Sequence, residues 1–307
     1  MTQRLVLTLL ASLVVTPGAL AQADTDQPEQ VQVESPWKAP RHRLLYKNLT
    51  VARVNPLGFQ DAFELAYQYR LFDSDSILLR DSFVGVATTA MVTPAFTRLG
   101  IAAQAQPLAI LYLEAKWQFA GWYGTFDTLQ TFGDVTADFS DTALEMGQGG
   151  ATTGWELDLI AELRLKVGPL VVRSRLTFIR TEMTPPVTAS DPLYYEPIYD
   201  LLVPTSGWSL TNDADALLFL LDERLIVGTR YSVGHVFYGA DAAIVPTHRM
   251  GPLVAYRFFK DPGSSFDAPT ALVLIQWYLR HPNRTGRDVS QAIPYVVVGF
   301  AFQGDLL

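Results

Sequence analysis

Apolar and polar residues alternate along most of the chain, and the clearest case is the stretch of residues 154–180. From Trp155 to Val167 every odd position is apolar, while the even positions carry five charged side chains. The side chains of a β-strand alternate between its two faces, so this pattern predicts a strand with one apolar and one charged face. A helix would scatter both sets around its circumference. Gly168-Pro169 then reverses the chain into a second strand.

The length of this alternation separates a soluble protein from a membrane protein. Strands of soluble domains usually run for about 5–6 residues, whereas the first arm alternates over the whole of 155–167. Long alternating strands, apolar toward lipid and polar toward the lumen, are typical of transmembrane β-barrels. The pattern therefore predicts an all-β fold, a closed antiparallel transmembrane β-barrel.

The same alternation, interrupted by turn signals, recurs along the chain. It predicts twelve strands at about 42–55, 61–72, 77–89, 95–105, 109–124, 154–167, 170–181, 208–221, 224–237, 248–260, 270–280 and 292–303. The two longest connections, 125–151 and 182–207, both fall at one end of such a barrel, and the connections at the other end are mostly short. Outer-membrane barrels have an even strand count, short periplasmic turns and longer external loops. Leu193 to Val203 could form an extra strand, which would spoil the even count. Ten or fourteen strands are the alternatives, because element boundaries are poorly defined by alternation alone.

The N-terminus predicts export. Arg4, the apolar run from Leu5 to Val15 and Ala19-Leu20-Ala21 form the three parts of a cleaved secretory signal over residues 1–21. The apolar run is too short for a spanning helix, which needs about 20 residues. Residues 22–41 are rich in Gln, Pro and charge and predict a flexible periplasmic segment. The barrel domain is then expected at 42–307.

Composition supports this interpretation. The chain has no cysteine, so neither a lipoprotein anchor nor a disulfide is expected. Nearly half of the residues are hydrophobic (49%), yet no stretch approaches 18 consecutive apolar residues. The net charge of −8 argues against nucleic acid as a partner, because that function needs a basic surface.

The last predicted strand, Tyr295 to Phe302, alternates apolar residues and ends in an aromatic residue. In this and in its overall pattern, the chain from about residue 42 resembles Gram-negative outer-membrane β-barrel proteins in general. Gln303 to Leu307 follow Phe302, which departs from the usual end of such strands. The resemblance implies an outer-membrane location with both termini periplasmic. It also implies contacts with outer-membrane lipid and lipopolysaccharide, and with periplasmic chaperones and the barrel-assembly machinery; the oligomeric state stays open.

The polar faces of these strands predict a charged lumen. The candidate lumen-lining residues are Glu64, Arg70, Arg98, Glu114, Lys116, Glu156, Asp158, Glu162, Arg164, Lys166, Arg173, Arg175, Asp213, Asp215, Arg224, Arg230, Arg249 and Arg257. Opposite charges on neighbouring strands can pair and fill a small interior. Alternatively, a surplus of arginine favours a narrow aqueous channel for small anionic solutes. A structural surface role and a channel are therefore both open.

The two long connections carry the remaining candidates. Tyr194, Tyr195 and Tyr199 lie among acids in 182–207 and could contact a ligand from an external loop, fold inward as a plug, or lie at the membrane boundary. The acids of 125–151 favour a solvated loop over a Ca²⁺ site, since their spacing matches no EF-hand. No cofactor and no metal is expected.

Two other functions remain as alternatives. His235 and His248 flank one predicted external loop, where an outer-membrane lipid hydrolase could have a rim active site. However, no His-x-Ser and no G-x-S-x-G motif occurs, so no catalytic residue is assigned. The second alternative is a soluble exported β-barrel or sandwich that buries the apolar faces in its own core.

Overall fold

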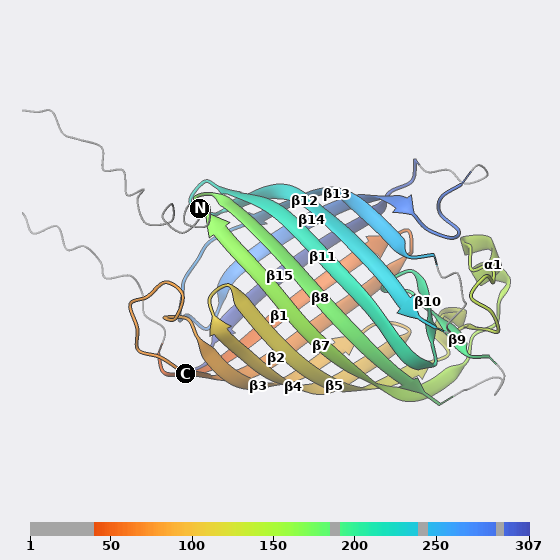
Figure 1. Ribbon diagram of the computed structural model, residues 1–307, viewed down its shortest axis with the longest axis horizontal. Coiled ribbons are helices and arrows are strands. Elements are labelled where there is room, and N and C mark those ends of the chain that lie inside the picture. Colours follow the sequence, from red (N-terminus) through yellow and green to blue (C-terminus); the bar gives the residue numbers. More distant parts are fainter. Residues whose placement is uncertain (1–39, 185–190, 239–244, 287–291) are drawn as a thin grey trace, which may run out of the picture. The chain divides into compact units, whose positions relative to one another are not determined.

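The computed structural model describes residues 40–184, 191–238, 245–286 and 292–307. The predicted signal peptide, and all but the last two residues of the predicted N-terminal segment, lie outside these described residues. Within them, twelve long antiparallel strands close into one barrel (Figure 1). These strands are β1 (His42–Val54), β2 (Gly58–Arg70), β3 (Phe83–Val92), β4 (Phe96–Leu108), β5 (Leu111–Tyr123), β7 (Ala151–Val167), β8 (Leu170–Met183), β11 (Ser206–Leu220), β12 (Leu225–Phe237), β13 (Thr247–Arg257), β14 (Asp267–Arg280) and β15 (Tyr295–Asp305). The predicted fold class and strand count are confirmed.

Closure is made by the first and last strands, β1 and β15, which pair from Leu45↔Asp305 to Val54↔Val296. This register places the start of β1 and the end of β15 at the same end of the barrel. That end, called the turn end here, also has the short connections 109–110, 168–169 and 221–224 and the longer ones 71–82 and 258–266. The opposite end, called the loop end, has the short connections 55–57 and 93–95 and the four connections 124–150, 184–205, 238–246 and 281–294, which include the two longest of the barrel. The predicted asymmetry between short and long connections is therefore present.

The outward face of the barrel is apolar. On β7, for example, Leu159, Leu163 and Val167 are 41%, 59% and 64% exposed, while Glu156 and Glu162 on the opposite face are each 5% exposed. Soluble proteins rarely expose contiguous apolar patches larger than a few hundred Å². The alternative in which these faces form the core of a soluble sandwich is therefore wrong, since the barrel turns them outward.

One polar cluster interrupts this outward face. Asp61 on β2 accepts hydrogen bonds from Asn48 and Thr50 on the neighbouring strand β1. Phe59 and Phe63, on either side of Asp61 and on the same face, are exposed. The hydrogen bonds satisfy the carboxylate within an otherwise apolar surface, as a polar group in contact with lipid requires.

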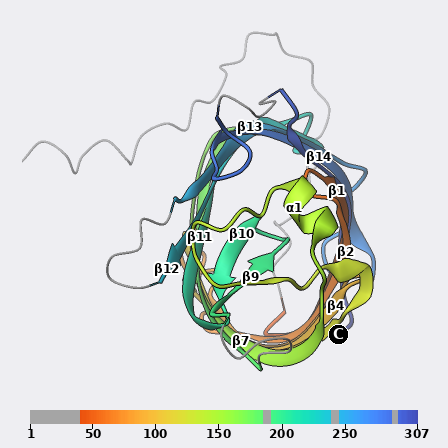
Figure 2. The same ribbon diagram turned by 90° about the vertical axis from the view of Figure 1, so that its right-hand side faces the viewer.

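Three further short strands and a short helix occupy the loop end. The connection between β8 and β11 forms a hairpin of β9 (Leu193–Glu196) and β10 (Leu201–Pro204), and β9 also pairs with β6 (Thr131–Phe132). The connection between β5 and β7 contains the 3₁₀ turn η1 (Thr125–Asp127) and the helix α1 (Asp141–Met146). Viewed along the barrel, β9 and β10 lie within the ring of strands (Figure 2). The possible extra strand at Leu193 to Val203 thus exists as two short strands that are not part of the barrel wall.

Some predicted boundaries are wrong. The third strand starts at Phe83 rather than at about residue 77, because residues 71–82 form a longer connection. Asp81, which falls within the predicted strand, is consequently exposed in that connection. Gln106-Pro107 does not turn the chain but lies inside β4, and the reversal is made by residues 109–110. No helix in the described residues combines the length and apolar character needed to cross a membrane.

Candidate functional site: a plugged lumen

The lumen face of strands β2 to β8 carries most of the predicted charged residues, and it carries them as ion pairs. Cross-strand register brings the partners together, since Lys116 lies opposite Asp158 and Glu162 opposite Arg175. The ion pairs are Lys47–Glu64 at 2.8 Å, Arg98–Glu156 at 2.9 Å, Lys116–Asp158 at 2.9 Å, Arg175–Glu162 at 3.2 Å and Arg164–Glu162 at 3.2 Å. Glu114 instead accepts hydrogen bonds from Tyr112 and Gln104. Opposite charges on adjacent strands thus satisfy each other inside the barrel.

A second group of charges spans β8, β11 and β12. The carboxylate of Asp215 is 2% exposed and lies 2.5 Å from Arg173 and 2.7 Å from Arg230. Asp213, on the same face of β11, accepts a hydrogen bond from Ser232 and lies 3.7 Å from Arg230. Two arginines therefore share one buried acid, and the side chain of Arg173 keeps 33% of its surface exposed.

The remaining candidates lie near the ends of strands. Arg70 lies 3.7 Å from Asp73, Lys166 pairs with Glu223, and Arg257 donates to the backbone of Glu223. Arg224 is not lumen-lining, because β12 begins only at Leu225 and the alternation does not extend to the turn. It is exposed at the turn end, where it donates to the carbonyl of Phe258 and lies over the outward ring of Tyr256.

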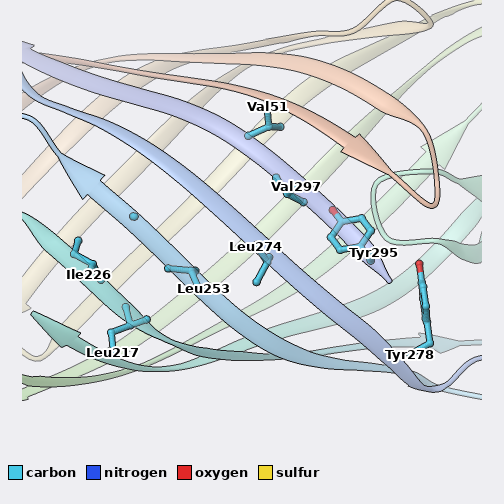
Figure 3. Close-up of a cluster of buried hydrophobic side chains, with 9 residues drawn as sticks. Val51, Leu217, Ile226, Leu253, Leu274, Tyr278, Tyr295 and Val297 are labelled. Carbon is cyan, nitrogen blue, oxygen red and sulfur yellow. The ribbon is translucent and has the colours of Figure 1, made fainter. Parts of the chain in front are cut away.

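The strands on the other side of the barrel present an apolar face to the interior. Val51, Leu217, Ile226, Leu253, Leu274 and Val297, from β1 and β11 to β15, form one buried cluster together with Tyr278 and Tyr295 (Figure 3). These residues occupy the same odd or even positions of their strands as the inward charged residues. Where they occur, the strand therefore has apolar side chains on both of its faces. The lumen face of β1 and β11 to β15 therefore carries an apolar patch beside its charged residues.

The hairpin of β9 and β10 plugs the loop end. All of its strand residues are buried, and Leu201 and Val203 pack with Phe96, Trp122 and Val236 of the barrel wall. Gly234 on β12 makes room for it, since a Cβ at this position would lie 2.6 Å from Leu201 Cδ1. Burial of this apolar surface stabilises the hairpin inside the barrel.

The three candidate tyrosines belong to this plug. Tyr194 and Tyr195 are 1% and 4% exposed, and Tyr199 lies at the hairpin tip and lines a cavity in the lumen. This corrects their expected position on an external loop surface, because the connection folds inward instead. Of the alternatives considered for this segment, the inward-folded plug is the one that the structure shows; contact of these residues with a ligand stays a prediction.

Two acids anchor the plug to the barrel. Glu196, at the end of β9, lies 2.6 Å from Arg98 on β4, so Arg98 bridges the plug and Glu156 of the wall. Asp200, with φ of 56°, turns the chain into β10 in the left-handed region that Asp tolerates better than most residues. Its carboxylate is fully buried. Each acid thus faces an arginine that belongs to a different part of the fold.

Asp200 is the centre of a hydrogen-bond network that joins four segments. Its Oδ2 accepts from Arg284 Nε at 2.5 Å and from Tyr278 at 2.8 Å, and its Oδ1 accepts from Tyr195 at 2.8 Å. His281 Nε2 lies 3.2 Å from Oδ2. Burial alone would raise the pKa of Asp200, but the hydrogen bond from His281 and the guanidinium of Arg284 hold it well below its usual range.

The outer side of Arg284 extends this network to the loop end. Its guanidinium makes two hydrogen bonds to Asp141, the first residue of α1, and one to Asn55 between β1 and β2. Sequence reasoning missed Arg284, His281 and Asp200 as a group. They lie in connections without periodicity, and no local pattern links positions 200 and 281–284.

The candidate rim site does not assemble a catalytic group within the described residues. His235 lies edge-on against Phe237, and His248 hydrogen-bonds Tyr231 at 2.5 Å, with both histidines on the outward face. The buried pair His281–Asp200 is already fully bonded, because His281 Nδ1 accepts the backbone N–H groups of Asn283 and Arg284. Within the same described residues, no group of three or more His, Cys, Asp and Glu side chains could hold a metal ion.

Together, the closed even-numbered barrel, its apolar exterior and its polar lumen wall define a transmembrane β-barrel of the outer-membrane type. No family model matches the sequence, and no curated protein matches it. Among solved structures, the KdgM porin matches with 9% identity and a TM-score of 0.39, over 86% of this chain and 99% of that one. OprD of Pseudomonas aeruginosa matches with 10% identity and a TM-score of 0.28, over 87% and 94%. The translocator domain of the autotransporter NalP of Neisseria meningitidis matches with 10% identity and a TM-score of 0.37, over 85% and 87%.

Proposed function

We propose that the protein is an outer-membrane channel for small solutes, with a preference for anions, and that the β9–β10 hairpin closes it in this structure. Its apolar exterior supports the membrane location, with the loop end external and both termini periplasmic. The observation that carries the proposal is the partly exposed arginine ladder on the lumen side of β8. Arg173 and Arg175 keep 33% and 36% of their side-chain surface exposed although both are ion-paired.

The position of these arginines supports the proposed preference for anions. Asp215 is already paired with Arg230, so Arg173 adds a positive charge that this acid does not fully neutralise. Charged side chains that line a narrow pore select for ions of the opposite sign. A twelve-stranded barrel lies between filled eight-stranded barrels and open sixteen-stranded porins, so a partly filled bore fits this strand number.

The experiment is conductance of the refolded protein in a planar bilayer under a KCl gradient. The double variant Arg173→Glu/Arg175→Glu should move the reversal potential toward cation selectivity. The matched control is Arg80→Glu/Arg224→Glu, which makes the same charge change at exposed turn residues outside the lumen. An equal reversal potential for both variants would count against a pore lined by β8.

If the natural chain does not conduct, the measurement is repeated on a variant in which the two acids that anchor the plug, Asp200 and Glu196, are replaced. A variant that lacks the Asp200 and Glu196 charges should conduct more readily than the natural chain. If this variant is folded and still carries no current, the channel proposal fails and a structural surface role is favoured.

A further inference from the structure

We infer that the cavity beneath the plug binds a small organic carboxylate with an apolar or aromatic body. This inference rests on the proposed channel, because it names the class of solute that would meet this site in the lumen. The cavity lies between the plug tip, with Ile198 and Tyr199, and the inward faces of β11 to β15. Its volume of about 150 Å³ is roughly ten times the 10–15 Å³ that one water needs, but well below a drug-sized pocket.

Arg249 on β13 supplies the positive charge. Its guanidinium lies over the ring of Tyr295 at 4.2 Å, and its Nη1 is buried without a hydrogen-bond partner. No carboxylate of the described residues forms an ion pair with it, whereas Arg98, Arg173, Arg175 and Arg230 each have one. A buried donor without a partner is unfavourable, and the planar guanidinium matches a carboxylate in two parallel hydrogen bonds.

The neighbouring charges leave the site net positive. Arg230 and Asp213 line the same cavity, and Asp213 is turned toward Ser232 and Arg230. Asp215 pairs with both Arg173 and Arg230. The three arginines Arg173, Arg230 and Arg249 thus face the two acids Asp213 and Asp215. The difference of one positive charge favours an anion, and one negative charge on the ligand balances it.

The apolar part of the ligand is specified by the other side of the cavity. Leu274 and Tyr295 line the cavity and also belong to the buried apolar cluster of the lumen wall. Ile198 and Tyr199 close it from the plug. An inorganic anion would leave these surfaces without a partner, while an aromatic or aliphatic body buries them. Benzoate combines a planar carboxylate with an apolar ring of suitable size, and acetate has the same carboxylate with almost no apolar body.

The test is equilibrium binding of benzoate and acetate by the refolded full-length chain in lipid nanodiscs, measured by calorimetry against empty nanodiscs. The natural chain should bind benzoate saturably and more tightly than acetate. Arg249→Gln should weaken benzoate binding by at least about tenfold, as loss of a charge-assisted hydrogen-bond pair implies. Arg257→Gln is the matched control, since Arg257 lies on the same face of β13 and also has a buried nitrogen without a partner, its Nε, but does not line the cavity; benzoate affinity of this variant should stay within about twofold.

Each outcome decides the inference. Lack of saturable binding, equal binding by Arg249→Gln, or equal loss in Arg257→Gln would overturn it. Acetate binding as tight as benzoate would overturn the apolar half of the site. If Arg249→Gln does not fold, Arg249→Lys is used instead. It keeps the charge but loses the planar pair of guanidinium donors, and should still weaken benzoate binding. Conductance of the folded variant without the Asp200 and Glu196 charges separates the two proposals. Binding without current in that variant leaves the site and refutes the channel, and current without binding does the reverse.

Discussion

Replacement of Asp200 by asparagine is the most direct perturbation of the plug. The carboxylate is fully buried and accepts hydrogen bonds from Arg284, Tyr278 and Tyr195. Removal of one partner of a buried ion pair costs about 3–5 kcal/mol, because it leaves an uncompensated charge. Arg284 keeps its two hydrogen bonds to Asp141, so the lower figure applies. Asp200→Asn should therefore destabilise the docked plug by about 3 kcal/mol.

This free energy predicts a large change in gating. Each 1.4 kcal/mol is a factor of about ten, so the ratio of open to closed channels should rise roughly a hundredfold. Single-channel recording of open probability measures this ratio. Asp141→Asn is the control, because Asp141 contacts the same arginine but its side chain is 63% exposed, and exposed pairs contribute about 0–1 kcal/mol. A folded Asp200→Asn variant with an open probability no higher than that of Asp141→Asn would refute the assigned role of this acid.

Two further predictions follow from the same structure. The depressed pKa of Asp200 means that the docked plug binds fewer protons than a released one, so docking is fully stabilised above the ordinary aspartate pKa of about 3.9 and weakens as pH falls below it. Conductance should thus be constant from about pH 5 to 8 and rise toward pH 3, and a rise toward alkaline pH instead would contradict this sign. On the outer face, Leu159→Arg should cost about 2–4 kcal/mol of stability in liposomes and Val167→Arg, at the strand end, about 0–1, as measured by urea unfolding. Equal effects of the two substitutions would show that lipid does not cover this face.

The local pattern was sufficient to predict the barrel wall. Strands such as 154–167 and 170–181 differ from β7 and β8 by no more than three residues at either end, because inside–outside alternation is a property of neighbouring residues alone. Where a strand lacks a contrast between its faces, as in β3, the predicted boundary was wrong by several residues. The inward position of Glu156, Asp158 and Glu162 also follows from parity, and the structure shows all three inside.

The predicted direction of side chains near the strand ends depended on the same alternation. Arg224 shows its limit, since one residue beyond a strand the parity no longer fixes the direction of a side chain. The interior apolar wall was also missed, because β11 to β15 carry apolar residues on both faces and alternation then gives no contrast to read.

The sequence by itself thus determined a closed barrel of long antiparallel strands with an apolar exterior and a charged lumen, since the contrast between these two faces repeats every second residue along the strands. Only the tertiary structure decided that the lumen is plugged, and by which contacts. Asp200 meets Arg284 and His281 across about eighty positions of the chain, and Arg249 is left without an acid because of which strands surround it. Such pairings depend on the closure of the barrel and the inward path of one hairpin, which no periodicity of neighbouring residues encodes.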